Sequence, residues 1–152
     1  TARSRGLGDV YKRQPYNTDQ WDGYPKEREK FYKTISNSQS SLILAGDSHN
    51  SWLSNLFDKN NKFVGVEIGA PSITSPNFVD TFGDFTEALD KSFIDSNKDL
   101  IWTNGRNKGY VELNIFSEYV DVKFNFVSSV KSKSYKNLKP IIFKVNHSEA
   151  IT

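Results

Sequence analysis

The amino-acid sequence predicts a mixed α/β domain. Residues 26–35 have the composition and apolar spacing of a helix, and the run LILA at 42–45 is entirely apolar, as in a strand buried among helices. From residue 109 onward, apolar and polar residues alternate with the period of an antiparallel strand. Since the chain has 152 residues, it is long enough for one domain with a sizeable core.

The first elements are a loop, a helix and a strand. Turn-forming and aromatic residues fill 15–24, and Pro25 suits the first turn of the helix expected over 26–35. The polar segment 37–41 ends that helix. The apolar run at 42–45 follows, and we expect it to form a buried strand that stops at a glycine.

The middle of the chain adds a strand, a loop and a helix. KFVGVEI at 62–68 has the composition of a strand, and GAPSITSPN at 69–77 is a loop held by two prolines. The segment 85–97 has helical spacing. Its expected apolar face consists of Phe85, Leu89 and Phe93.

The last third of the chain predicts an antiparallel β-hairpin. The alternating segments 109–116 and 119–127 are joined by only two residues. Alternation places one set of side chains toward the core, namely Val111, Leu113 and Ile115, and the set between them outward, namely Glu112 and Asn114. IIFKV at 141–145 predicts a further strand, and 128–139 is a polar loop without a site role.

Composition excludes several classes of protein. No apolar run approaches the roughly 20 residues that cross a bilayer, so we infer no membrane partner. Without cysteine, the chain has neither a disulfide framework nor a thiolate zinc site. Residues 1–14 hold four basic residues and one acidic residue, a net of +3, which leaves −1 for the remainder of a chain whose formal charge is +2. No basic patch with interleaved aromatics remains, and we infer no nucleic-acid partner.

The segment GDSHN at 46–50, directly after the apolar run, carries the candidate chemistry. Active sites of α/β folds lie at the carboxyl ends of strands. In an extended chain, residues two apart point to the same side, so Asp47 and His49 would face one cavity while Ser48 points away. A carboxylate and an imidazole suit a divalent or trivalent cation. The sequence predicts Asp47 and His49 as metal ligands, with no catalytic residue beyond them.

Two alternatives remain open at this stage. The block AGDSHN is similar to the first block of GDSL-type (SGNH) serine hydrolases, in which the nucleophile would be Ser48. Such enzymes need a late Asp-x-x-His, whereas the late histidine here is His147 and position 144 is lysine. The other alternative is a non-catalytic β-rich binding module, in which 46–50 is only a turn.

Four segments, taken together and in order, resemble the C-terminal half of the PhoD-like alkaline phosphatases of the metallophosphoesterase superfamily. They are NTDQWDGYPKEREKFYKTI (17–35), LILAGDSHNSWLSNL (42–56), GVEIGAPSITSPN (65–77) and GRNKGYVELNIFSEYVDVKFNFV (105–127). The resemblance implies that residues 15–152 are the C-terminal part of one such domain, an αββα sandwich with metals between its two sheets.

The resemblance also implies the chemistry. These enzymes hydrolyse phosphate monoesters or diesters with calcium, and in some members with iron(III). The Gly-Asp-x-His motif carries late metal ligands, which here fall on Asp47 and His49. Asn50 and Glu67 would support a ligand or approach the substrate. Members of the family act outside the cell or in the periplasm, so we expect the same location for the intact protein.

One departure from the family pattern limits these expectations. The early ligand blocks of the family, of Asp-x-His and Gly-Asn-His/Asp type, do not occur in this sequence. Two ligands are fewer than the three, plus an open position, that a catalytic metal site requires. We therefore expect this chain alone to be inactive and to need the N-terminal half of the same domain as its partner.

The first prediction concerns residues 1–14, which lack apolar periodicity and resemble translated library-adapter sequence. We expect this tail to be dispensable, so deleting it should leave the thermal midpoint unchanged and its amides should exchange quickly. Strong protection of these amides, or a fall of several degrees in Tm upon deletion, would contradict a non-native origin.

Overall fold

The computed structural model describes residues 21–36 and 41–152. The tail at 1–14, most of the loop at 15–24 and most of the polar stop at 37–41 therefore lie outside the described residues. Over the part that is described, no helix has the length and apolarity needed to cross a membrane.

The first sheet has four strands in the order β1-β3-β2-β4. Its strands are β1 (Leu42–Ala45), β2 (Ser51–Phe57), β3 (Phe63–Gly69) and β4 (Leu100–Asn104). β1 runs parallel to β3, whereas β2 runs antiparallel to both of its neighbours, β3 and β4. The chain therefore crosses over the end of β3 when it passes from β1 to β2.

The second sheet is a meander of three antiparallel strands. They are β5 (Lys108–Ile115), β6 (Tyr119–Val127) and β7 (Ile141–Asn146), in that order. The predicted late hairpin is confirmed as β5 and β6, and the predicted strand at 141–145 as β7. Alternate residues of β6 are buried, as the period of the sequence indicates.

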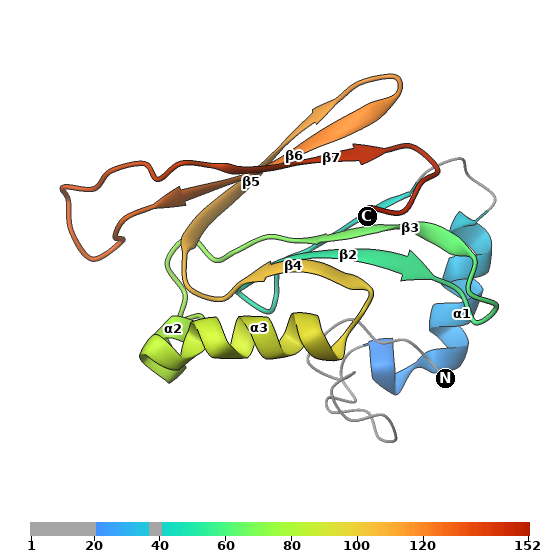
Figure 1. The fold of residues 1–152 in the computed structure, drawn as a ribbon, viewed down its shortest axis with the longest axis horizontal. Coiled ribbons are helices and arrows are strands. Elements are labelled where there is room, and N and C mark those ends of the chain that lie inside the picture. Colours follow the sequence, from blue (N-terminus) through green and yellow to red (C-terminus); the bar gives the residue numbers. More distant parts are fainter. Residues whose placement is uncertain (1–20, 37–40) are drawn as a thin grey trace.

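Helices cover the face of the first sheet that the second sheet does not (Figure 1). They are α1 (Pro25–Ile35), α2 (Phe78–Phe82) and α3 (Thr86–Ser96), with short 3-10 turns η2 (Trp21–Gly23) and η3 (Gly83–Phe85). The result is three layers, helices on sheet on sheet, and it confirms the mixed α/β fold class.

The main core lies between the two sheets. Leu53, Val66 and Ile68 of the first sheet pack against five residues of the second, namely Val120, Val122, Phe124, Phe126 and Val145. A smaller core beneath α1 contains Tyr32, Leu56 and Val64. Trp52 joins β2 to the helices, because its ring packs edge-on against Phe78 of α2 and also contacts Phe93 of α3.

Two strands of the first sheet, β2 and β4, were not predicted from the sequence. β2 is buried along nearly its whole length, yet SWLSNLF interrupts its apolar residues with Ser51, Ser54 and Asn55. Asn55 donates through Nδ2 to the Ile151 carbonyl and accepts from the Ile151 N–H, both at 2.9 Å. Such bonds offset the cost of burying an amide, but they come from residues far away in the sequence.

Residues 42–45 do form the predicted strand, but the expectation that it is buried is wrong. Among the described strands β1 pairs with β3 alone, at the edge of the first sheet, and Leu44 is 65% exposed. Two predicted core positions are also corrected. Ile115, at the end of β5, is 71% exposed, and Phe85 belongs to η3 rather than to α3 and is 77% exposed. Val111 and Leu113 do pack against the main core, as predicted.

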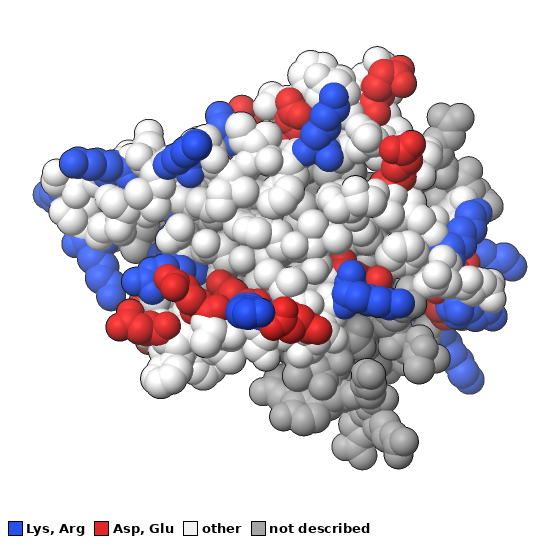
Figure 2. All heavy atoms as spheres, viewed as in Figure 1, with Lys and Arg blue, Asp and Glu red and all other residues white. Residues whose placement is uncertain are grey.

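Charged side chains are spread over the face shown in Figure 2, and two groups stand out. Acidic residues with interspersed basic ones lie over α2 and α3, and lysines lie over the loop between β6 and β7. Arg106 approaches Asp84 at 3.8 Å and Glu87 at 3.7 Å, and both carboxylates are highly exposed. Ion pairs of this exposed kind contribute little to stability.

A pair of phenylalanine substitutions tests the position of the core. Phe124 is fully buried between the sheets and contacts Trp102 at 4.7 Å between ring centroids. We expect Phe124→Ala to lower the free energy of unfolding by about 3–5 kcal/mol in urea denaturation, through lost burial and a residual cavity. The control Phe85→Ala removes an exposed ring and should change it little. Equal effects of the two substitutions would contradict this core.

Candidate functional site

Three loops meet at one edge of the first sheet. β1 and β3 are parallel and end side by side, with Ala45 opposite Gly69. β3 and β4 are both antiparallel to β2, so β4 runs in the same direction as β1 and β3. The segments 46–50, 70–77 and 105–107 therefore follow strand ends at the same edge. Ligand sites of α/β sheets lie at such carboxyl edges, so the motif has the position that the sequence predicted.

The motif itself is a tight turn rather than extended chain. The His49 N–H donates to the Gly46 carbonyl at 3.1 Å, and His49 has a left-handed φ of 60°. The sequence predicted an extended chain, in which Asp47 and His49 would face the same side. That prediction is wrong, because the segment is a turn. Asp47 occupies a central position of the turn and is exposed.

The His49 ring has a defined orientation. Its Nδ1 lies 2.9 Å from the Pro76 carbonyl oxygen, in the loop that follows β3. A carbonyl can only accept, so Nδ1 carries the proton, and in the neutral ring Nε2 keeps its lone pair. A histidine that donates one nitrogen to a carbonyl is oriented to ligate metal through the other. This geometry fits the ligand role predicted for His49.

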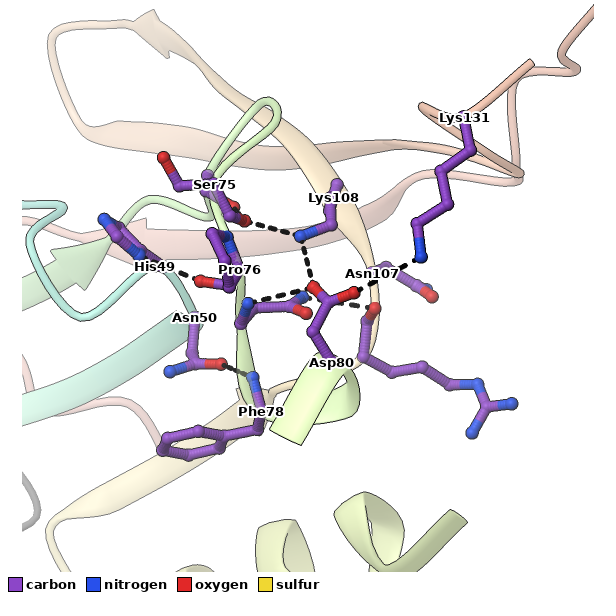
Figure 3. Close-up of polar contacts among 12 residues, drawn as sticks. His49, Asn50, Ser75, Pro76, Phe78, Asp80, Asn107, Lys108 and Lys131 are labelled. Carbon is purple, nitrogen blue, oxygen red and sulfur yellow. Dashed lines mark hydrogen bonds and ion pairs between the residues drawn. The ribbon is translucent and has the colours of Figure 1, made fainter. Parts of the chain in front are cut away.

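Asn50 is fully buried and links the motif to α2. Its Nδ2 donates to the Ser48 carbonyl at 2.6 Å, and its Oδ1 accepts from the Phe78 N–H, at the start of α2, at 3.1 Å (Figure 3). Of the two roles considered for Asn50, these contacts favour orienting the turn over touching a substrate.

Ser48 makes contacts that suit structure rather than nucleophilic attack. Its Oγ accepts from the Trp52 indole N–H at 2.6 Å. The late histidine lies elsewhere, because Nε2 of His147 contacts the Phe116 carbonyl at 3.1 Å, near the tip of the β5–β6 hairpin. A serine nucleophile needs a base within hydrogen-bond reach, and His147 does not supply one.

Glu67 lies on β3, away from the turn. It is paired with Ile43 of β1 and with Ser54 of β2. Directly paired residues point to the same face of a sheet, and Ile43 packs against the small core beneath α1. Glu67 therefore lies on the helix-covered face. Its predicted role in supporting a ligand or approaching a substrate stays a prediction.

The residues present fit part of a metal site. Asp47 offers a carboxylate and His49 an imidazole nitrogen, donors that suit a hard or borderline cation. Among the described residues, however, no three His, Asp or Glu side chains are grouped so that they could hold an ion. The described residues thus offer at most two of the three or more ligands that a catalytic centre requires.

The structure also brings in residues that the sequence analysis did not single out. Lys108, at the start of β5 and 9% exposed, donates through Nζ to Asp80 Oδ2 at 2.7 Å and to the Ser75 carbonyl at 2.5 Å (Figure 3). The hydrogen bond from Lys108 holds the pKa of Asp80 below its ordinary value, and the hydrogen bond from the Asn77 N–H lowers this pKa further. No motif or spacing in the sequence links these residues.

A second carboxylate fixes the loop after β4. Both oxygens of Asp90, on α3, accept from the Gly105 N–H, at 3.2 and 2.9 Å. Burial raises the pKa of Asp90, and the Gly105 bond opposes that shift. Gly105 itself has no room for a side chain, since an added Cβ would lie 2.7 Å from the Phe78 ring. The loops at this edge are therefore closely packed onto α2 and α3.

Comparison with known proteins agrees with the resemblance seen in the sequence. The family described as PhoD-like phosphatase matches residues 3–124. This match begins inside the segment 1–14, whose non-native origin stays a prediction. Alkaline phosphatase D of Bacillus subtilis (strain 168) is 44% identical over 66 residues, which are 40% of this chain and 11% of that protein.

A solved structure supports the fold. The structure described as that of PhoD superposes with a TM-score of 0.65 over 88% of this chain, at 22% sequence identity. The chain spans 27% of the length of that structure. Since the family pattern extends over well more than half of its residues, the chain belongs to the PhoD-like phosphatase family.

Proposed function

We propose that the intact protein is a metal-dependent phosphoric ester hydrolase, of the alkaline phosphatase or phosphodiesterase type. The observation that supports this most directly is the orientation of His49, whose Nδ1 is held by the Pro76 carbonyl so that Nε2 is available as a ligand. His49 follows a strand at the carboxyl edge of the first sheet, two residues after the exposed Asp47, and the chain belongs to the PhoD-like phosphatase family.

In this proposal Asp47 and His49 hold metal and transfer no proton. Bound cations would neutralise the charge that develops on the phosphoryl oxygens and activate water for the attack on phosphorus. The chain's own task is to keep the turn rigid. Asn50 does so by hydrogen bonding to both the Ser48 carbonyl and the Phe78 N–H, which keeps Asp47 and His49 at a fixed place relative to α2.

Donor chemistry and the family resemblance support a choice of metals. The carboxylate of Asp47 suits calcium, which takes oxygen ligands, and the imidazole of His49 suits a transition metal such as iron. We propose calcium as a resident ion, with iron(III) as a second one. The remaining ligands would come from the N-terminal half of the domain, since the described residues group no third acidic or histidine side chain with these two.

The exposed edge of the first sheet supports this partner. Within residues 21–36 and 41–152, β1 pairs with β3 only, and Leu44 is 65% exposed. An apolar edge strand with unpaired backbone groups is a template for further strands. We propose that strands of the N-terminal half extend the sheet there, next to Asp47 and His49. By the same family resemblance, we place the intact enzyme outside the cell or in the periplasm.

Substitutions in the intact protein test the proposal. His49→Ala and Asp47→Ala should each lower the rate of p-nitrophenyl phosphate or bis-ester hydrolysis by more than about 100-fold, beyond the loss typical of groups that only support a ligand. Ser48→Ala, the matched control inside the same turn, should have a mild effect because its hydroxyl only accepts from Trp52. Chelation should abolish the activity of the wild-type protein, and added calcium should restore it.

The opposite pattern would overturn the metal assignment. If Ser48→Ala abolished hydrolysis while chelation left it intact, the serine esterase alternative would replace the proposal. If all three substitutions left hydrolysis unchanged, the turn would have no catalytic role. An intact protein without any hydrolysis would instead favour the binding-module alternative. Residues 1–152 alone should hydrolyse neither p-nitrophenyl phosphate nor the bis-ester.

A further inference from the structure

We infer that Asp80 and Lys108 position the imidazole of His49, by fixing the peptide group between Pro76 and Asn77 in one orientation. The inference deepens the proposed function, because it explains how this ligand is held, and it rests on that function only for its catalytic meaning. Neither Asp80 nor Lys108 is proposed to touch metal or substrate; both are positioning residues.

The central element is a single planar peptide unit. Its carbonyl oxygen, from Pro76, accepts the His49 Nδ1–H at 2.9 Å. Its N–H, from Asn77, donates to Asp80 Oδ2 at 3.1 Å. Because the carbonyl and N–H of a trans peptide are coplanar and point in opposite directions, a bond at one end orients the other. Asp80 therefore fixes the direction of the carbonyl that faces His49.

Lys108 holds the same peptide from both sides. Its Nζ donates to Asp80 Oδ2 at 2.7 Å, which sets the position of the carboxylate that accepts from Asn77. It also donates to the Ser75 carbonyl at 2.5 Å, in the peptide unit just before Pro76. Ser72 Oγ reinforces this by donating to the same carbonyl at 2.6 Å. The pyrrolidine ring fixes φ of Pro76 in between.

Burial makes this arrangement specific. The Lys108 side chain is 10% exposed and that of Asp80 25% exposed, so the ammonium needs both acceptors to offset its desolvation. The two residues come from β5 and α2, whereas His49 follows β1. Three separate parts of the chain thus converge on a loop, and the chain of bonds from Nζ to Nδ1 is continuous (Figure 3). Linked hydrogen bonds of this kind strengthen one another.

A neighbouring lysine provides the matched control. Lys131 Nζ lies 3.8 Å from Asp80 Oδ1, the other carboxylate oxygen, and its side chain is 85% exposed. Exposed pairs of this kind contribute little. A lysine can therefore be removed beside Asp80 without removing the buried contact. If only positive charge near Asp80 mattered, Lys108→Met and Lys131→Met would change the His49 ring equally. The series of hydrogen bonds from Lys108 to His49 instead predicts an effect of Lys108→Met and none of Lys131→Met.

Measuring the tautomer of His49 shows whether Asp80 and Lys108 position its ring or only stabilise the fold. The chain has two histidines, and they are expected to differ: His49 donates from Nδ1 to Pro76, while His147 donates from Nε2 to Phe116. Long-range ¹H–¹⁵N NMR of the imidazoles, on the metal-free chain at alkaline pH, distinguishes these tautomers. His147 thus serves as an internal reference in every spectrum.

We expect Lys108→Met and Asp80→Leu, which removes the acceptor of the Asn77 N–H, to release the Pro76 carbonyl. The Nδ1–H share of His49 relative to the Nε2–H share should fall by roughly fivefold, which corresponds to the loss of one ordinary hydrogen bond. The tautomer of His147 should not change. Lys108→Arg, which keeps a buried cation and its donors, should restore a large part of the wild-type ratio, and Lys131→Met should leave that ratio unaffected.

Two results would overturn the inference. One is a wild-type spectrum in which His49 is protonated at Nε2. The other is an unchanged His49 tautomer in Asp80→Leu, a variant of similar shape without an acceptor, whose backbone amide spectrum can verify that the fold is retained. Failure here remains distinct from failure of the proposed function. The tautomer is read without metal or turnover, whereas the proposed function falls if His49→Ala leaves hydrolysis by the intact protein unchanged.

Discussion

The position of β3 between β1 and β2 is the constraint on which the candidate site depends. β3 pairs in parallel with β1 and antiparallel with β2, so the chain must cross the end of β3 to connect its two neighbours. The crossing is made by residues 46–50, the segment with Asp47 and His49. The loop that leaves β3 emerges at the same place, and the contact of Pro76 with His49 follows from this topology.

Buried polar groups hold this edge together where strand pairing ends. The loop at 70–77 leaves the sheet after Gly69, so its carbonyls need partners of another kind. Lys108 supplies one for Ser75, His49 one for Pro76, and the amide of Asn50 joins the turn to α2. Each of these groups would be costly to bury without its partner. The same bonds that satisfy burial therefore fix the side chains that we propose as ligands.

The structure supplies one side of a site rather than a complete one. β1 has an edge that no other described strand pairs with, and its Leu44, three residues before Asp47, is exposed. The chain spans 27% of a solved PhoD structure, and the described residues group no third metal donor with the two in the turn. These observations fit together if the site forms between this edge and the rest of the domain, with the rigid turn as a prepared half.

Prediction from sequence succeeded where local pattern and burial agree. The alternation of 119–127 predicts the inward residues of β6 because one face of that strand packs on the other sheet. It failed for β2, since the buried Ser51, Ser54 and Asn55 give that strand the polarity of a surface segment, and the partner of Asn55, Ile151, lies 96 positions away. It failed for Ile115 because alternation gives direction but not how far the opposing sheet extends.

The sequence by itself determined the family, the hairpin and the Gly-Asp-x-His segment with its donor types, because motifs and periodicity are written in neighbouring residues. Only the tertiary structure decided that the segment is a turn, that His49 donates from Nδ1 to Pro76, and that Lys108 and Asp80 hold this carbonyl. Single contacts among these join residues up to 33 positions apart, and the whole series spans the 59 positions from His49 to Lys108. Pairing over such separations depends on how strands and loops stack, and no local pattern encodes it.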